Sequence, residues 1–115
     1  MEVQIFGTKK HPDTRKALRF FAERRIRTHF VDFAQRAPSV GELRRFVQKF
    51  GTQALIDRQS KRFVALGFGH SAYGEEKWLA ILADEPLILR QPLVRSANLL
   101  TIGDAESTWK EWTAR

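Results

Sequence analysis

The sequence of 115 residues predicts a single α/β domain with a mixed sheet, spanning residues 1–115. Two observations predict this class. An apolar strand, an amphipathic helix and a second strand follow one another near the start, and a hairpin followed by a helix closes the chain. Alternation of strand with helix favours a parallel pair, and the hairpin adds antiparallel strands. With 43% hydrophobic residues, nine Phe and three Trp, the chain can bury a substantial apolar core.

The first third predicts a β-α-β unit. Val3 to Phe6 is a short apolar run typical of a buried strand, and Gly7-Thr8 ends it. Pro12 suits the first position of a helix, where its missing N–H costs nothing, and this helix is predicted to reach about Arg25. A second strand is predicted from Thr28 to Phe33. The apolar face of the helix contains Ala17, Leu18, Phe21 and Ala22.

The middle of the chain, about residues 37–84, is predicted to be mainly helical. Ser39 and Glu42 are three positions apart and predict a capping box, and Gly51 is predicted to end that helix. Residues 54–62 are predicted to be a turn and a loop, and residues 74–83 a further helix. The side chains predicted to be buried in the two helices are Leu43, Phe46, Val47, Phe50, Trp78, Ile81 and Leu82.

The last third is predicted to return to strands, at residues 86–89, 93–95 and 99–102. The turn Ser96-Ala97-Asn98 separates the last two, which are therefore predicted to form a hairpin. Gly103-Asp104 predicts a turn and the start of a closing helix. Trp109 and Trp112 are predicted to form a core seam along that helix, together with Ala105.

Composition restricts the classes of function. Twenty Lys and Arg against 13 Asp and Glu give a net charge of +7, which indicates an anionic partner. These basic residues are spread along the chain, which favours a solvated basic surface over a nucleic-acid stripe. No apolar run approaches the roughly 20 residues that cross a bilayer, and Glu2 and Gln4 interrupt any signal-peptide pattern, so we expect a cytoplasmic protein without membrane contact. The sequence contains no Cys, which excludes disulfides, a thiolate nucleophile and cysteine-ligated metals.

Several short motifs occur in order between residues 3 and 112. They are Ile5-Phe6-Gly7-Thr8-Lys9-Lys10-His11-Pro12-Asp13-Thr14-Arg15-Lys16-Ala17, then Ala54-Leu55-Ile56-Asp57-Arg58-Gln59-Ser60-Lys61, then Glu85-Pro86-Leu87-Ile88-Leu89 and Gln91-Pro92-Leu93-Val94, with a following Gly103. Together they resemble the arsenate reductase (ArsC) and Spx family. The resemblance implies a thioredoxin/glutaredoxin-like domain with a helical insertion at about residues 37–84. It also implies a cis proline at Pro92.

The chemical residues of this family differ in the present sequence. Family members carry a nucleophilic cysteine at the helix start, one oxyanion-binding arginine in the middle loop and another just before the proline. Those three positions are His11, Gln59 and Gln91 here. Arg58 and Arg90 stand one position earlier. Because neighbouring side chains of an extended segment face opposite ways, Arg90 is expected to point away from the family's arginine position, whereas Arg58 lies in a predicted loop and could compensate.

His11 cannot reproduce the chemistry of a cysteine. Imidazole forms neither the thiol-arsenate nor the mixed-disulfide intermediate of the family, and a helix N-terminus disfavours the imidazolium, so a capping or surface histidine is favoured over a catalytic one. No metal site or cofactor is predicted, because the three His residues show no i,i+4 pairing. The helix start could still hold a small oxyanion, although ordinary surface lysines explain its basic residues equally well. The candidate anion-binding residues are Lys9, Lys10, Arg15, Arg58 and Arg90.

The segment Gly67-Phe68-Gly69-His70-Ser71, flanked by Phe63 and Tyr73, allows two interpretations. Aromatic residues among glycines are typical of a binding loop, but a loop held in place by buried Phe is favoured.

The sequence therefore favours an ArsC/Spx-like protein with a degenerate active site, acting as a non-catalytic binding or regulatory protein. By analogy with Spx, its partner would be another protein, for example RNA polymerase. The alternative is an arsenate reductase or thiol oxidoreductase-like enzyme that uses an external thiol, from glutathione or a partner. A nucleic-acid binder is the weaker alternative.

Overall fold

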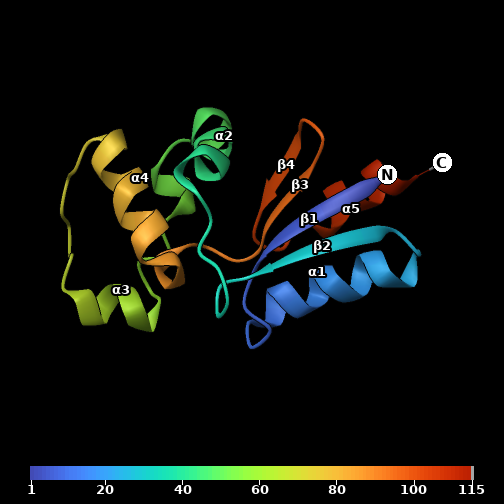
Figure 1. The fold of residues 1–115 in the computed structure, drawn as a ribbon, viewed down its shortest axis with the longest axis horizontal. Helices are drawn as coiled ribbons and strands as arrows, with labels where there is room; N and C mark the ends of the chain where they lie inside the picture. The colour runs from blue at the N-terminus through green and yellow to red at the C-terminus, as the bar shows by residue number, and fades with distance from the viewer. Residues whose placement is uncertain (115) are drawn as a thin grey trace.

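The central feature of the computed structural model, which describes residues 1–114, is a four-stranded sheet in the order β2-β1-β3-β4 (Figure 1). The strands are β1 (Glu2–Gly7), β2 (Arg27–Asp32), β3 (Leu93–Ser96) and β4 (Leu99–Ile102). β1 and β2 are parallel, whereas β3 is antiparallel to both β1 and β4. The predicted mixed sheet, the parallel pair and the closing hairpin are all confirmed.

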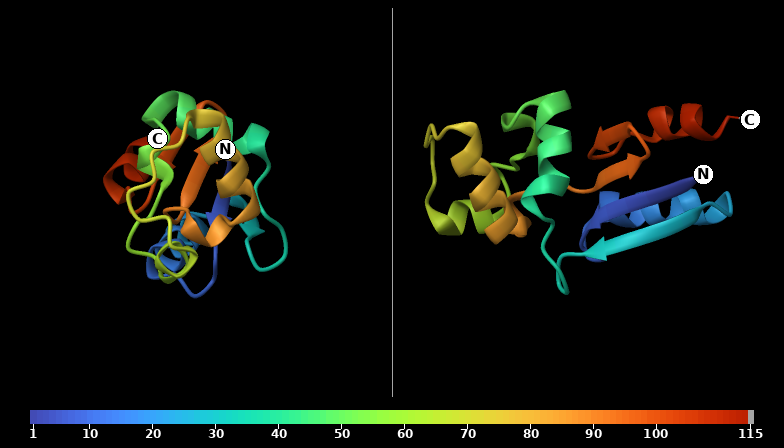
Figure 2. Two further views of the ribbon diagram at one scale, coloured as in Figure 1. Left: turned by 90° about the vertical axis from the view of Figure 1, so that its left-hand side faces the viewer. Right: turned by 45° about the horizontal axis from the view of Figure 1, so that its top comes forward.

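Residues 1–114 also form five α-helices: α1 (Pro12–Glu23), α2 (Val40–Phe50), α3 (Lys61–Leu66), α4 (Glu75–Asp84) and α5 (Glu106–Thr113). α1 and α5 pack on one face, while α2, α3 and α4 gather beyond the end of the sheet at which β1 and β2 finish (Figures 1 and 2). The molecule is accordingly elongated, with extents of 43 × 27 × 23 Å. None of the helices formed by residues 1–114 is long and apolar enough to cross a membrane.

Two apolar clusters hold these layers together. One lies between the sheet and the pair α1 and α5, where Trp109 is fully buried against Phe20 and Phe21. The indole Nε1–H of Trp109 donates to Thr101 Oγ1 at 2.8 Å, so this large side chain is buried without leaving its donor unpaired. The other, larger cluster joins the opposite face of the sheet to α2 and α4, and includes Phe6, Phe46, Trp78, Leu82 and Leu93.

Short-range signals in the sequence account for most element boundaries. Pro12 is the first residue of α1, and Ser39 with Glu42 forms the complete predicted capping box of α2. Gly51 follows α2 with φ of +83°, a conformation that glycine adopts without strain. Ala97 and Asn98 connect β3 to β4, with Ala97 at a φ of +53°.

Three local predictions were wrong. Residues 86–89 do not form a strand: Pro86–Ile88 is a 3₁₀ helix, η2, and Leu89 makes only an isolated bridge to Ile56. An apolar run without alternation does not distinguish these states, and the fixed φ of Pro86 suits a helical turn. Residues 54–62 are not simply a loop, because they contain the end of a second 3₁₀ helix, η1 (Gln53–Leu55), and the first two residues of α3. Phe50 is 37% exposed rather than buried.

Candidate functional site at the start of helix α1

The loop between β1 and α1 lies directly against the segment that enters β3. The peptide bond between Gln91 and Pro92 is cis, as the resemblance predicted. The approach of the two segments is close enough that a Cβ on Gly7 would lie 2.5 Å from Thr14 Oγ1 and 3.1 Å from Gln91 Oε1. Only a residue without a side chain fits at the end of β1.

Gln91 connects the two segments. Its side chain is almost fully buried, and Oε1 accepts hydrogen bonds from Thr8 N (2.7 Å), Thr8 Oγ1 (3.0 Å) and Thr14 Oγ1 (3.3 Å). Thr14 itself is fully buried in the first turn of α1. The amide oxygen of Gln91 therefore occupies the inner side of the β1–α1 loop and receives three donors there.

His11 is the N-cap residue of α1. Its backbone is extended, with φ of −76° and ψ of 126°, and its Nδ1 accepts a hydrogen bond from Asp13 N at 3.2 Å. The neutral imidazole that makes this bond carries its proton on Nε2. His11 therefore acts as a helix cap, the role that aspartate, serine and asparagine usually fill.

Exposed cations surround this helix start. Lys9, Lys10 and Arg15 are exposed and form no ion pair within the described part of the chain. Lys16 is different because its Nζ lies 2.8 Å from Asp104 Oδ2, which raises the pKa of Lys16 and lowers that of Asp104 through the same hydrogen bond. The positive end of the helix dipole and three unpaired cations would attract an anion to this surface.

Arg58 does not reach this cluster. Its guanidinium donates to Gly69 O at 2.8 Å and to Gln53 Oε1 at 2.6 Å, and lies over the ring of Phe63. Gln59 is exposed in the turn that precedes α3, where its backbone N–H donates to Asp57 Oδ1. Gln59 is therefore solvated, and the guanidinium of the adjacent Arg58 has structural partners.

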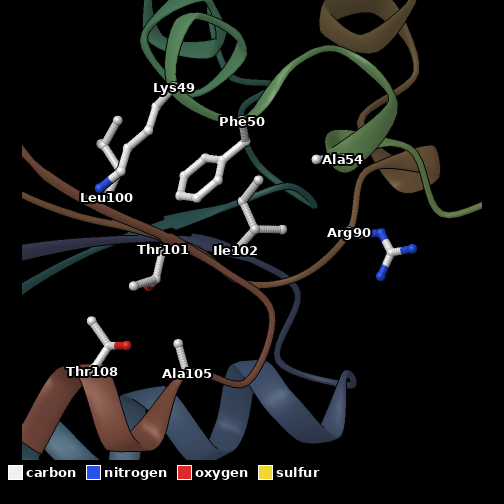
Figure 3. Close-up of a pocket in the computed structure, with 9 residues that line it drawn as sticks. All are labelled: Lys49, Phe50, Ala54, Arg90, Leu100, Thr101, Ile102, Ala105 and Thr108. Carbon is white, nitrogen blue, oxygen red and sulfur yellow. The ribbon is translucent and has the colours of Figure 1, made fainter.

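Arg90 and Gln91 point to different sides of the chain, as expected for neighbouring residues in an extended segment. Arg90 is exposed and lines a pocket between α2, β4 and α5 (Figure 3). Gln91 instead turns inward to Thr8. The structure thus brings His11, Gln91 and Pro92 together, and leaves Arg58, Gln59 and Arg90 outside their cluster.

The segment from Gly67 to Ser71 is held by aromatic packing. Phe68 contacts Phe63, Tyr73 and Trp78 at ring-centroid distances of 5.7, 6.3 and 5.7 Å. These contacts support the interpretation of a loop held by buried side chains. In residues 1–114, no group of three or more metal-ligating side chains comes together.

Sequence reasoning missed Thr8 and Thr14. Thr14 lies three and seven positions before Ala17 and Phe21, on the buried face of α1, so the helical period indicates its burial. Nothing local indicates its bond to Gln91, which is 77 positions away.

These features define a thioredoxin-like domain. It consists of a β-α-β unit, a helical insertion and an antiparallel hairpin, and a cis proline precedes the hairpin beside the start of α1. Residues 6–112 match the model of the ArsC family, and the chain belongs to this family. The predicted fold class and the predicted membership of the ArsC family are confirmed. No curated protein matches the chain in a sequence search.

Solved structures show the same fold. An arsenate reductase from Vibrio cholerae superposes with a TM-score of 0.82 at 23% identity, covering 96% of this chain and 97% of that one. An ArsC family related protein from Bacteroides fragilis superposes with a TM-score of 0.85 at 17% identity, covering 96% of this chain and 97% of that one. A protein from Yersinia pestis, described as an arsenate reductase, superposes with a TM-score of 0.81 at 20% identity, covering 95% of this chain and 98% of that one. At these identities the likeness concerns the fold.

Proposed function

We propose that this chain is a non-catalytic, Spx-like member of the ArsC family that acts by binding a partner protein. The observation that carries the proposal is the position of the Gln91 amide oxygen, which accepts hydrogen bonds from Thr8 and Thr14 inside the β1–α1 loop. These hydrogen bonds hold the β1–α1 loop against Gln91, whose amide oxygen is an uncharged acceptor.

An oxyanion at this place would compete with groups of the protein. The backbone N–H of Thr8 already donates to Gln91, and that of Asp13 already donates to His11. The amide oxygen of Gln91 carries partial negative charge and would repel an oxyanion that approached these donors. A site built to hold arsenate needs the opposite arrangement, with free donors and a guanidinium directed inward.

The chemistry of the available groups supports the same proposal. Reduction by the family's route requires a sulfur nucleophile, and the printed sequence contains no cysteine. His11 uses Nδ1 to cap α1, and imidazole does not form a mixed disulfide.

An arsenate reduction assay tests the absence of catalysis. The protein is incubated with arsenate, glutathione and glutaredoxin, and arsenite is measured beside a competent reductase and a heat-denatured sample. We expect arsenite no higher than in the denatured sample. Turnover that disappears in His11→Ala, but not in the surface variant Lys61→Ala, would establish the alternative of an enzyme that uses an external thiol.

A pull-down from native lysate tests the binding role. The proposal takes RNA polymerase, by analogy with Spx, as the first partner to examine, and assumes a cytoplasmic role. Retention that survives rising salt is expected for a protein interface with an apolar centre. Steep loss with salt, together with recovered nucleic acid, would support the nucleic-acid alternative.

A further inference from the structure

Strand β4 lies at the free edge of the sheet, and its hydrogen-bond pattern determines which backbone groups are open. Among the described residues, β3 is its only neighbour in the sheet. Gly103 N donates to Pro92 O at 2.9 Å, so residues 92 and 103 are a bonded pair, and bonded pairs alternate along an antiparallel ladder. Val94 and Thr101 are then the next bonded pair. The N–H and C=O groups of Leu100 and Ile102 consequently point away from β3, toward the open edge.

A groove runs along this edge. The end of α2 lies on one side of it with Lys49 and Phe50, and α5 lies on the other with Ala105 and Thr108 (Figure 3). Its volume is about 530 Å³. Phe50 lies on the face of α2 that the helical period predicts to be buried. It is nevertheless 37% exposed, because its ring lines this groove. The groove therefore combines free backbone groups with apolar side chains, as surfaces that accept an added strand do.

The charged groups of this groove are all positive. Lys49 and Arg90 line it, and Arg45 lines the adjoining pocket, with which it shares Leu100. These three cations have no carboxylate partner within residues 1–114, and no acidic residue lines either pocket. Three arginines elsewhere on the surface do have such partners: Arg36, Arg44 and Arg62 each lie 2.6 to 2.9 Å from a glutamate oxygen.

We propose that the edge of β4 binds an extended, acidic segment of a partner protein, which adds to the sheet as a fifth strand. β4 has four residues and spans about 13 Å, enough to pair with about four residues of such a segment. Because successive side chains of a strand face opposite ways, the acidic side chains of the segment would meet Lys49 on the side of α2, and the apolar ones would meet Ala105 on the side of α5. A second copy of this chain is disfavoured, because edge-to-edge pairing would bring the same cations toward one another.

The inference rests on the proposed binding role, for which it names the chemistry of the partner, and it concerns a surface separate from the start of α1. The two proposals are therefore tested apart: arsenite formation concerns His11 and Gln91, whereas peptide binding concerns β4.

The test uses a fluorescein-labelled eight-residue peptide of alternating glutamate and valine, and a matched peptide of alternating lysine and valine. Fluorescence anisotropy measures binding, and amide hydrogen exchange by NMR measures protection of Leu100 and Ile102. We expect the acidic peptide alone to bind, and to slow exchange of both amides by about tenfold or more, while the already bonded Thr101 amide changes less.

Charge variants provide the matched control. Lys49→Glu with Arg90→Glu should weaken binding of the acidic peptide by about tenfold or more. Arg19→Glu with Lys61→Glu changes the net charge equally at distant surface positions. At an ionic strength that screens long-range charge effects, this pair should leave binding within about twofold.

Four results would overturn the inference. One is binding of the acidic peptide without slower exchange at Leu100 and Ile102. The second is a preference of this groove for a thymidine oligonucleotide over the acidic peptide, which would identify a nucleic-acid surface. The third is protection of the two amides without peptide, together with a dimer in sedimentation, which would identify a second copy as the occupant. Absence of peptide binding would also refute it, and would leave the reductase assay unaffected.

Discussion

Replacement of Gln91 by alanine tests the interaction on which the candidate site depends. The change removes an acceptor shared by Thr8 N, Thr8 Oγ1 and Thr14 Oγ1. Leaving a buried donor unsatisfied costs about 1–3 kcal/mol. Thr14 is fully buried, whereas Thr8 is partly open to water, so we expect a loss of about 2 kcal/mol in the free energy of unfolding. Arginine has no acceptor either, and Gln91→Arg should lose a similar amount.

Urea denaturation, followed by fluorescence of the buried Trp78 and Trp109, measures this loss. With a slope of about 2 kcal/mol per molar urea, a loss of about 2 kcal/mol lowers the midpoint by about 1 M. Gln59→Ala is the matched control, because Gln59 is exposed and should change stability by less than about 0.5 kcal/mol. If Gln91→Ala and Gln59→Ala unfold at the same urea concentration, the Gln91 contacts do not hold the loop. The hydrogen bonds of Gln91 then no longer support the proposed function.

The remaining predictions concern two glycines and one glutamate. Gly7→Ala should lower stability by about 1–3 kcal/mol, because the added Cβ would meet Thr14 and Gln91 at 2.5 and 3.1 Å. Gly41 lies in the first turn of α2, and a Cβ added there would have no neighbour closer than 3.9 Å, so Gly41→Ala should instead raise stability by about 0.5–1 kcal/mol. Calorimetry measures both changes, and equal effects of Gly7→Ala and Gly41→Ala would contradict the reasoning. The hydrogen bond from Arg36 lowers the pKa of Glu42 below its usual 4.5, so the ionised form is stabilised by folding. The stability that Glu42 contributes is thus complete above about pH 4.5 and is lost as the pH falls toward the folded-state pKa. The stability difference between the wild-type protein and Glu42→Gln should therefore shrink on acidification from pH 6 to pH 3, and a difference that grows would refute this sign.

Features that depend on residues within one or two turns were predictable from the sequence. The capping box of α2, the start of α1 at Pro12 and the hairpin from β3 to β4 all follow from side chains a few positions apart. Motif order along the chain was sufficient to identify the family, and the cis bond before Pro92 followed from that identification. The run at residues 86–89 was predicted wrongly because its apolar character fits either a strand or a helical turn.

The state of the candidate site was decided by tertiary structure. The sequence places glutamine at residue 91 and arginine at residue 90, but only the packed fold determines that Gln91 turns inward to donors 77 to 83 positions away. It likewise determines that Arg58 donates to Gly69, and that Arg90 lines the pocket beside β4.

The physical reason is the range of the forces that fix each feature. Helix caps, turns and periodic apolar faces are set by steric and hydrogen-bonding preferences of neighbouring residues, which the sequence displays directly. The direction of a buried polar side chain depends on which donors the fold brings within about 3 Å, and those donors come from segments remote in sequence. The sequence by itself therefore determined the fold and the absence of a sulfur nucleophile, whereas the packing of β1, α1 and β3 decided how the remaining polar groups of the site are used.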